Sequence, residues 1–239
     1  MAIDPHRLET DLDLVEAVER ASLRLVVQAV YGFLDEAREI FRQESDLVAD
    51  IGEDITREAL DRLGTSVIPI RLFGKIDYKR ARYIFHPDYS VLQALFVDSK
   101  AEKVEGQRTA TIQTAQTSMH IRQVRSGVAV DEPGTLPKII ERGDQHLLTT
   151  TIFVKYNYRE VPSVGNDLES VTLACLPNGI LQNRYNPSAS DTFWLVGRNA
   201  PTRGEEFRAR ISFDQLKRKA SWRVQYMDGH SQRPFRWED

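Results

Sequence analysis

Apolar positions follow a helical period near the start of the chain. Between residues 12 and 42 they recur at spacings of three and four, which is typical of one long amphipathic helix. A second, shorter helix is expected over residues 53–63, because Gly64 and then Pro69 supply stop signals after it. Both helices are predicted to be packing elements.

The pattern changes from helix to strand after Pro69. The segments "IRLFGKIDYKRARYIF" and "VLQALFVDSK" are rich in β-branched and aromatic residues, and the turn-forming "HPDYS" separates them, so they predict a β-hairpin. Further strands are expected at residues 149–160, 170–177, 191–197 and 206–214, whereas residues 109–123 favour a helix-like or irregular segment. Because the sequence has no internal repeat, the simplest prediction is an α/β fold in which helices flank a mixed β-sheet.

Composition favours one folded unit without a membrane segment. The chain has 239 residues, of which 41% are hydrophobic and 28% charged, and this excludes the disordered class. No apolar run reaches the about 18 residues that a membrane span needs, and "MAIDPHRLETDLDL" is too acidic for a secretory signal, so a cytoplasmic protein without a membrane partner is expected. The single cysteine, Cys175, lies in "LACLP" and is predicted to be a buried strand thiol rather than a nucleophile.

Charge is unevenly distributed along the chain. The formal net charge is −3, but residues 1–66 hold 16 acidic and 7 basic residues, whereas residues 184–223 hold 9 basic and 4 acidic residues. A basic segment on an acidic body can direct a polyanion to one surface. A solvated charged face explains the same asymmetry equally well.

Three aspartates near the predicted hairpin are candidate metal ligands. If the hairpin turns about Pro87 and Asp88, residues whose numbers add up to about 175 face one another, so Asp77 lies opposite Asp98. Cβ atoms of directly opposed residues are about 4.5 to 5.5 Å apart, close enough for two carboxylates to share one Mg²⁺. Asp88 is at the turn and is therefore the poorer candidate.

Asp98 and Lys100 are two residues apart on one predicted strand, so their side chains project from the same face, with the Ser99 carbonyl between them. Two aspartates supply hard oxygen ligands, and a lysine can orient the attacking water or offset developing negative charge. This constellation predicts metal-assisted phosphodiester hydrolysis. The bare pattern is weak, and a solvated strand end is the alternative.

A family resemblance covers nearly the whole chain. The resemblance rests on the sequence segments "LRLVVQAV", "EDIT", "IDYKRAR", "VDSKA", "TTIFV", "YNYRE", "RYNP", "RGE", "FDQLK" and "RW". In these segments the sequence resembles the type II restriction endonucleases of the SfiI/BglI group, which belong to the PD-(D/E)xK nucleases. The resemblance implies a restriction-endonuclease-like core of a mixed sheet flanked by helices, with a DNA-reading β-hairpin added. It also implies catalytic roles for Asp77, Asp98 and Lys100, and the hairpin geometry selects the same two aspartates.

The same resemblance implies an activity, and the length, charge and patterns of the chain imply its division. The expected activity is Mg²⁺-dependent hydrolysis of double-stranded DNA at an interrupted GC-rich palindrome, leaving 5′-phosphate ends and 3′ overhangs. The metal ligands are predicted to be Asp77, Asp98 and Ser99. Residues 1–239 are expected to form one domain, with a helical packing region at 1–66, a catalytic core at 68–175 and a basic DNA-recognition region at 184–223.

A GC-rich target predicts arginines on a groove-reaching element, because arginine can meet guanine O6 and N7 together. Arg208 and Arg210 point to one side of a predicted strand and align with an Arg-x-Arg of the family. They could instead pair with Glu205, Glu206 and Asp214, or contact phosphates without specificity. The candidates for DNA contacts are therefore Arg208 and Arg210, with Arg203 near a turn, Arg108 after the catalytic strand, and Arg184 and Arg198 as phosphate contacts.

Partners and alternative functions follow from the same features. The expected partners of this prokaryotic enzyme are double-stranded DNA, a second copy in a homodimer or in a tetramer that bridges two sites, and a cognate methyltransferase in the host. The alternatives are a non-cutting DNA-binding or bridging protein and a structure-specific repair nuclease. No "GxxxxGK" loop is present, so coupling to ATP hydrolysis is not expected. The histidines have no paired spacing, which argues against a zinc site, and the tryptophans are expected in the core or an interface: His6, His86, His120, His146, His230, Trp194, Trp222 and Trp237.

Overall fold

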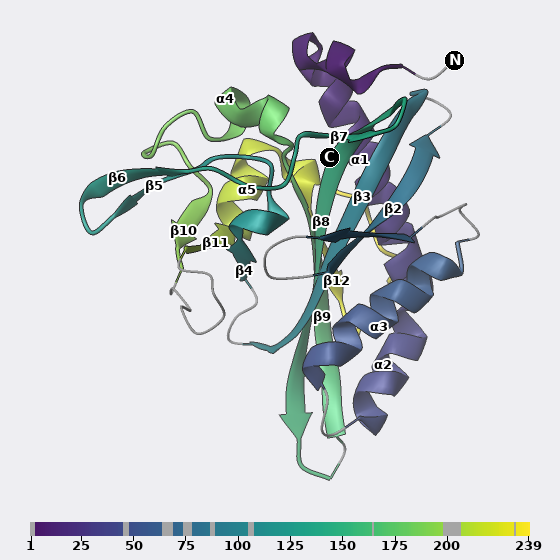
Figure 1. The fold of residues 1–239 in the computed structure, drawn as a ribbon. Helices are drawn as coiled ribbons and strands as arrows, with labels where there is room; N and C mark the ends of the chain where they lie inside the picture. Colours follow the sequence, from purple (N-terminus) through teal and green to yellow (C-terminus); the bar gives the residue numbers. More distant parts are fainter. Residues whose placement is uncertain are drawn as a thin grey trace.

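Three helices near the N-terminus cover one face of a central β-sheet (Figure 1). They are α1 (Leu12–Gly32), α2 (Leu34–Gln43) and α3 (Val48–Asp61). The computed structural model describes residues 3–44, 48–63, 69–73, 78–86, 89–104, 108–163, 165–197, 207–231 and 233–239. None of the helices within these ranges is long and apolar enough to cross a membrane.

The single helix predicted over residues 12–42 is two helices. The chain leaves the helical conformation at Phe33, whose φ and ψ are −114° and 9°. Gly32 precedes the break and has low helix propensity, and Phe33 is only 3% exposed in the core. Burial of this ring by a local turn therefore overrides a periodicity that continues across the break. The third helix begins at Val48, five residues earlier than expected.

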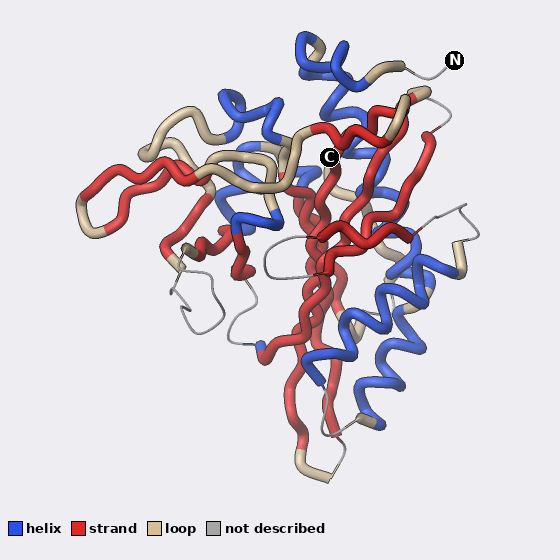
Figure 2. Tube along the Cα trace, in the orientation of Figure 1, coloured by secondary structure: helices blue, strands red, loops and turns tan. Residues whose placement is uncertain are grey.

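The central sheet is mixed, as predicted, and Figure 2 shows its strands in red with the helices in blue beside it. Only the β3 and β8 pair is parallel among the pairs that the described strands form, and the others are antiparallel. The strand order is β1-β2-β3-β8-β9-β12, and β7 pairs with β8. The bounds are β1 Pro69–Phe73, β2 Tyr78–His86, β3 Val91–Lys103, β7 Ile139–Arg142, β8 Gln145–Val161, β9 Gly165–Leu176 and β12 Val224–Asp228.

The β2–β3 hairpin is confirmed, but its predicted register is wrong by two residues. The pairs run from Ala81 with Phe96 to His86 with Val91, so the residue numbers add up to 177 rather than 175. Ser90 has a φ of 52°, and this left-handed residue belongs to a turn that lies later in the chain than a turn about residues 87 and 88. The proposed facing of Asp77 and Asp98 loses its basis in this register. Asp77 and Asp88 both lie outside the described residues.

A second, smaller sheet lies on the side of the central sheet away from α2 and α3 (Figure 1). It consists of β10 (Trp194–Val196), β11 (Arg208–Ser212) and β4 (Thr109–Gln113), in the order β10-β11-β4. The prediction of a helix-like or irregular segment over residues 109–123 is therefore wrong, because these residues contain β4, the 3₁₀ turn η3 (Thr114–Gln116) and the start of β5. The partner of β4 is β11, about a hundred residues further along the chain, so no local pattern reveals the pairing.

Strand β5 (Ile121–Arg125) pairs with β6 (Val128–Glu132) in a hairpin that projects beside the smaller sheet (Figure 1). Ser126 and Gly127, with φ of 48° and 80°, form its two-residue turn, and positive φ at both positions is the requirement of a type I′ turn.

Short helical segments complete the fold: η1 (Pro5–Thr10), η4 (Gly179–Leu181), α4 (Gln182–Tyr185), α5 (Phe213–Lys219) and η6 (Ser221–Arg223). The predicted strand over residues 206–214 ends at Ser212, because the Ser212 side chain accepts a hydrogen bond from the Gln215 N–H and caps α5. The Ser-x-x-Gln spacing is the sequence signal for this cap.

Each face of the central sheet has its own core. On the helix side Leu95, Ile152 and Leu173 pack with Val26 and Ile55. On the opposite side a second core joins the central sheet to the smaller sheet: Phe153, Ala174, Ile112, Trp194 and Ile211. The predicted burial of Cys175, Trp194 and Trp222 is confirmed, and Trp237 packs partly buried against the helix-side core.

A buried ion pair fastens α1 to η6. Arg223 Nη2 lies 2.7 Å from Glu19 Oε2, and both side chains are fully buried. The Asn178 N–H donates to the other oxygen of Glu19 at 2.7 Å. Burial raises the pKa of Glu19, against the lowering effect of Arg223 and of this hydrogen bond. The carboxylate therefore depends on Arg223 to remain charged in the interior.

Candidate active site

Asp98, Lys100 and Glu102 alternate along β3 and share the face of the central sheet that is turned toward the smaller sheet. In the parallel β3–β8 register, Asp98 lies beside Phe153, which belongs to the core between the two sheets. The Lys100 ammonium is 3.6 Å from Asp98 Oδ2, and the two side chains are 31% and 25% exposed. The predicted projection of Asp98 and Lys100 from one face is confirmed, and both are half-buried rather than at a solvated strand end.

Ser99 points to the opposite face and anchors the strand to α3. Its hydroxyl donates to Thr56 Oγ1 at 2.8 Å, and the Thr56 hydroxyl is 2.9 Å from the Tyr156 hydroxyl. Gly52 of α3 lies so close to the strand that a Cβ there would be 3.2 Å from the Ala101 nitrogen. The Ser99 side chain is thus part of the core. The predicted metal ligand of Ser99 can therefore only be its backbone carbonyl.

A second lysine lies beside Lys100, and the sequence analysis missed it. Lys155 is the neighbour of Lys100 in the β3–β8 register, and its side chain is only 1% exposed. Its ammonium is 2.7 Å from Glu102 Oε2 and donates to the Thr109 carbonyl at 2.5 Å. Burial lowers the pKa of Lys155, although Glu102 acts in the opposite direction. Its signal in the sequence is one charged residue inside the otherwise uncharged run "TTTIFVKYNY".

Both lysines are bonded to the edge strand of the smaller sheet. Lys100 Nζ donates to the Thr111 carbonyl at 2.9 Å, and Lys155 Nζ to the Thr109 carbonyl. Both carbonyls belong to β4, whose other edge pairs with β11 so that Thr111 faces Arg210. A single strand therefore separates the lysines of the candidate site from the arginines of β11.

Arg208 and Arg210 lie on one face of β11, as predicted, while Ala209 and Ile211 are buried on the other. Arg210 is exposed and donates to the Val196 carbonyl at 3.1 Å. Arg208 is half-buried, and its Nε and Nη2 have no hydrogen-bond partner within the part of the chain that the structure describes.

The other predicted arginines differ in what holds them. Arg108 is 75% exposed and lies 3.3 Å from Asp214, an acidic residue that the alternative interpretation assigned to the arginines of β11. Arg184 is bound by two carboxylates of α1, Asp13 at 2.8 Å and Glu16 at 3.0 Å, and the hydrogen bond to Asp13 raises its pKa. Arg198 and Arg203 lie outside the described residues.

Comparison with known proteins decides the family. The family model described as "Type II restriction enzyme SfiI" matches residues 17–227. The curated type II restriction enzyme SfiI of Streptomyces fimbriatus is 35% identical over 97% of this chain and 91% of its own length. The chain belongs to the SfiI family of type II restriction enzymes.

Solved structures agree with this SfiI-family assignment. A crystal structure of tetrameric restriction endonuclease SfiI bound to cognate DNA matches with a TM-score of 0.84 and 33% identity, over 100% of this chain and 94% of that chain. The restriction endonuclease BglI bound to its DNA recognition sequence matches with a TM-score of 0.76 over 95% of this chain and 94% of that chain. At 15% identity the BglI match shows the fold alone. The resemblance stated from the sequence is confirmed, and so is the restriction-endonuclease-like α/β fold.

As a member of the SfiI family, the chain is a site-specific deoxyribonuclease of the type II class. Type II restriction endonucleases generally need a divalent metal. The described residues fit such an ion, because Asp98 offers a half-buried hard oxygen donor. Glu102, on the same face, is already engaged by Lys155. Among the described residues, Asp98 is therefore the best candidate to hold the metal.

Proposed function

We propose that this SfiI-family enzyme hydrolyses double-stranded DNA at an interrupted GC-rich palindrome in the presence of Mg²⁺, leaving 5′-phosphate ends and 3′ overhangs. The observation that carries the proposal is the half-buried pair of Asp98 and Lys100 on the sheet face that carries the buried ion pair of Lys155 and Glu102. Each subunit contributes one such site, and a homodimer matches the two-fold symmetry of a palindrome.

In this proposal Asp98, Asp77 and the Ser99 carbonyl hold the ion. Bound Mg²⁺ supplies Lewis-acid stabilisation of the charge that develops on the phosphate. Lys100 orients the attacking water and offsets negative charge at the phosphorus, and its place 3.6 Å from Asp98 supports this role. Water attacks phosphorus in line, the bond from phosphorus to the 3′-oxygen breaks, and the phosphate stays on the 5′ end. Asp98 and its neighbours keep the reacting groups aligned.

Base recognition is assigned to the exposed face of β11. Arg208 and Arg210 project together; Arg210 is exposed, and Arg208 has two buried nitrogen donors, Nε and Nη2, for which the described residues offer no partner. Guanine O6 and N7 are the acceptors that such groups fit. Arg108, Arg198 and Arg203 are proposed as additional DNA contacts.

Arg184 is the weakest of the predicted DNA contacts, because Asp13 and Glu16 already bind its guanidinium.

We also infer that β4 couples recognition to catalysis. Arg210 faces Thr111 across the β11–β4 ladder, and the Thr111 carbonyl accepts the hydrogen bond of Lys100. Lys155 fixes the same strand two residues earlier through Thr109. A shift of β11 on the DNA therefore moves the acceptor that positions the catalytic lysine.

The DNA partner and the assembly are supported by the solved relative, which is a tetramer bound to cognate DNA. We propose a homodimer as the cutting unit, with a tetramer that bridges two sites as the larger assembly. A companion methyltransferase that protects host DNA is expected with such an enzyme. We also propose the functional division into three regions. Residues 1–66 contain the helices α1, α2 and α3, residues 68–175 contain the proposed catalytic strand β3, and residues 184–223 contain the proposed base-recognition strand β11.

The direct test is digestion of a sequenced GC-rich plasmid in Mg²⁺, followed by sequencing of the fragment ends. Discrete ends with 3′ overhangs at an interrupted palindrome are expected, and Asp98→Ala is the negative control. Binding without cutting would favour the non-cutting DNA-binding protein. Cutting of branched DNA with the plasmid left intact would favour the repair nuclease.

A further inference from the structure

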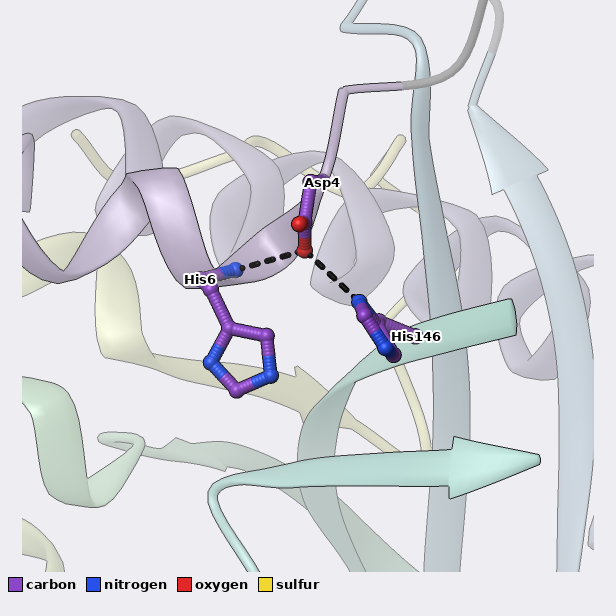
Figure 3. A group of neighbouring side chains, drawn as sticks. All are labelled: Asp4, His6 and His146. Carbon is purple, nitrogen blue, oxygen red and sulfur yellow. Dashed lines mark hydrogen bonds and ion pairs between the residues drawn. The ribbon is translucent and has the colours of Figure 1, made fainter. Parts of the chain in front are cut away.

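Two histidines that are distant in the sequence meet at the end of the sheet where β3 and β8 begin. His6 lies on η1 and His146 near the start of β8, and their rings are 4.9 Å apart in an edge-to-face arrangement. Asp4 lies between them, with its Oδ1 3.0 Å from His146 Nδ1 and 3.1 Å from the His6 backbone nitrogen (Figure 3). The expectation that spacing argues against a histidine metal site is therefore incomplete, because the fold brings these two histidines together.

We propose that Asp4, His6 and His146 form a binding site for a divalent cation of the zinc type, separate from the nuclease site. Their potential ligand atoms all lie within 4.8 Å of one another. Ligand atoms around tetrahedral Zn²⁺ at about 2.0 to 2.2 Å are roughly 3.4 Å apart, so the three groups must close by about 1.4 Å at most. All three side chains are partly exposed and can make this adjustment by rotation.

A further carboxylate, that of Glu141, lies beside this group but outside the set of ligand atoms that are all within 4.8 Å of one another. Glu141 of β7 is the direct cross-strand partner of His146, so both side chains lie on one face. Glu141 Oε1 is also 3.8 Å from His6 Nε2. Two imidazoles and one carboxylate are a donor set that suits Zn²⁺, with a fourth position open to water or to Glu141 after rotation of its exposed side chain. Imidazole favours zinc over Mg²⁺, which prefers an all-oxygen set.

The backbone around this site is held in place without metal. Ile3 forms a bridge with Val91 of β3, and its N–H donates to the Ser90 carbonyl at 2.6 Å. Leu8 of η1 is 1% exposed in the core between the sheets. Bound metal would fasten η1 to the central strand β8. Val91 is seven residues before Asp98, roughly 23 Å along a strand at about 3.3 Å per residue, so an ion here acts on stability rather than on the scissile phosphate.

A second group of similar composition serves as the internal comparison. Asp167, Glu169 and His230 also have ligand atoms within 4.8 Å of one another. Arg159 Nε, however, lies 3.1 Å from Glu169 Oε1, within hydrogen-bond distance, so one of the three ligands is already occupied by a guanidinium. We make no proposal for this group, and His230 supplies the matched control variant.

The experiment is calorimetric titration with ZnCl₂ near neutral pH, in the Asp98→Ala background and in excess Mg²⁺, so that the nuclease site does not take the ion. One saturable equivalent per chain is expected, with affinity reduced at least about 10-fold in His146→Ala and unchanged in His230→Ala. At about 100-fold excess over Kd, Zn²⁺ should raise Tm by roughly 5 to 10 °C, and not in His146→Ala. His6→Gln, at a partly exposed position, repeats the test if His146→Ala fails to fold.

Absence of saturable binding would overturn the proposal, and so would equal binding by His146→Ala or His6→Gln. Because the readout is zinc affinity and Tm in a background without the catalytic aspartate, the result is independent of whether the protein cuts DNA.

Discussion

Replacement of Lys155 by methionine tests whether β4 positions Lys100, the proposed catalytic lysine. Methionine retains most of the apolar length of the side chain and removes the ammonium that joins Glu102 to the Thr109 carbonyl. Lys155 is 1% exposed whereas Glu102 is 40% exposed, so after the change Glu102 can return to water. Because the volume is kept and no buried carboxylate is left, the free energy of unfolding should change by no more than about 2 kcal/mol.

The expected effect on cleavage is larger than the effect on stability. Two lysine hydrogen bonds hold β4, one from Lys155 to the Thr109 carbonyl and one from Lys100 to the Thr111 carbonyl. The Lys155→Met change removes the first and leaves the second. A misplacement of a catalytic group by about 1 Å can cost about 100-fold in rate. We therefore expect kcat to fall roughly 10- to 100-fold while KM for DNA changes little.

The assay is single-turnover cleavage of a cognate duplex in Mg²⁺, with binding measured separately in Ca²⁺. Lys103→Met is the matched control, because Lys103 lies on β3 but is 55% exposed and pairs with Glu160 at the surface. Cleavage by Lys155→Met at the wild-type rate would refute the coupling argument. Equal loss of binding and cleavage would reduce Lys155 to a structural role.

Three other substitutions probe separate parts of the molecule. Asp98→Ala should reduce Mg²⁺-dependent cleavage to background with folding and Ca²⁺-dependent binding intact, and normal cutting by this variant would remove Asp98 from the site. Arg210→Ala should cost about 1 to 3 kcal/mol of discrimination, measured as the ratio of cleavage rates on the cognate duplex and a duplex with one G·C pair replaced, and an unchanged ratio would argue against base contact. Arg223→Met should destabilise the fold by about 3 to 5 kcal/mol, because it leaves the fully buried Glu19 without its partner. Burial raises the pKa of Glu19, so the protonated carboxyl is favoured in the folded state. The loss in free energy of unfolding, measured by urea titration, should therefore be larger at about pH 8, where the carboxylate must ionise, than at about pH 5. A loss of stability independent of pH would contradict this account.

The sequence predicted those parts of the fold that depend on local patterns. Helical periodicity identified the regions of α1 and α3, and β-branched runs identified β3, β8 and β9. The break at Phe33 was missed because the core that buries this ring is made by residues far away in the chain. Strand β4 was missed for the same reason, since its partner β11 follows about a hundred residues later.

The candidate site was predictable to the extent that it lies on one strand. Asp98 and Lys100 were found because residues two apart on a strand share a face. Lys155 was not, because its proximity to Lys100 depends on the parallel pairing of β3 with β8. The register that joined Asp77 to Asp98 depended on the place of the turn, and Ser90 shows that a shift of one residue in the centre of a turn moves each cross-strand pair by two.

The position of β4 gives a physical reason why discrimination between sites can arise at the cleavage step. In the proposed function the arginines of β11 contact bases. Strand β11 pairs with β4, and β4 carbonyls accept the hydrogen bonds of Lys100 and Lys155. A phosphate contact contributes to affinity at any sequence, whereas a base contact depends on the correct base pair. If β11 and with it β4 are displaced at a wrong site, the affinity for DNA should change little while the bonds that orient Lys100 weaken. A wrong site would therefore be bound and cut slowly, and the comparison of Arg210→Ala with Lys155→Met separates the loss of base contact from the loss of this connection.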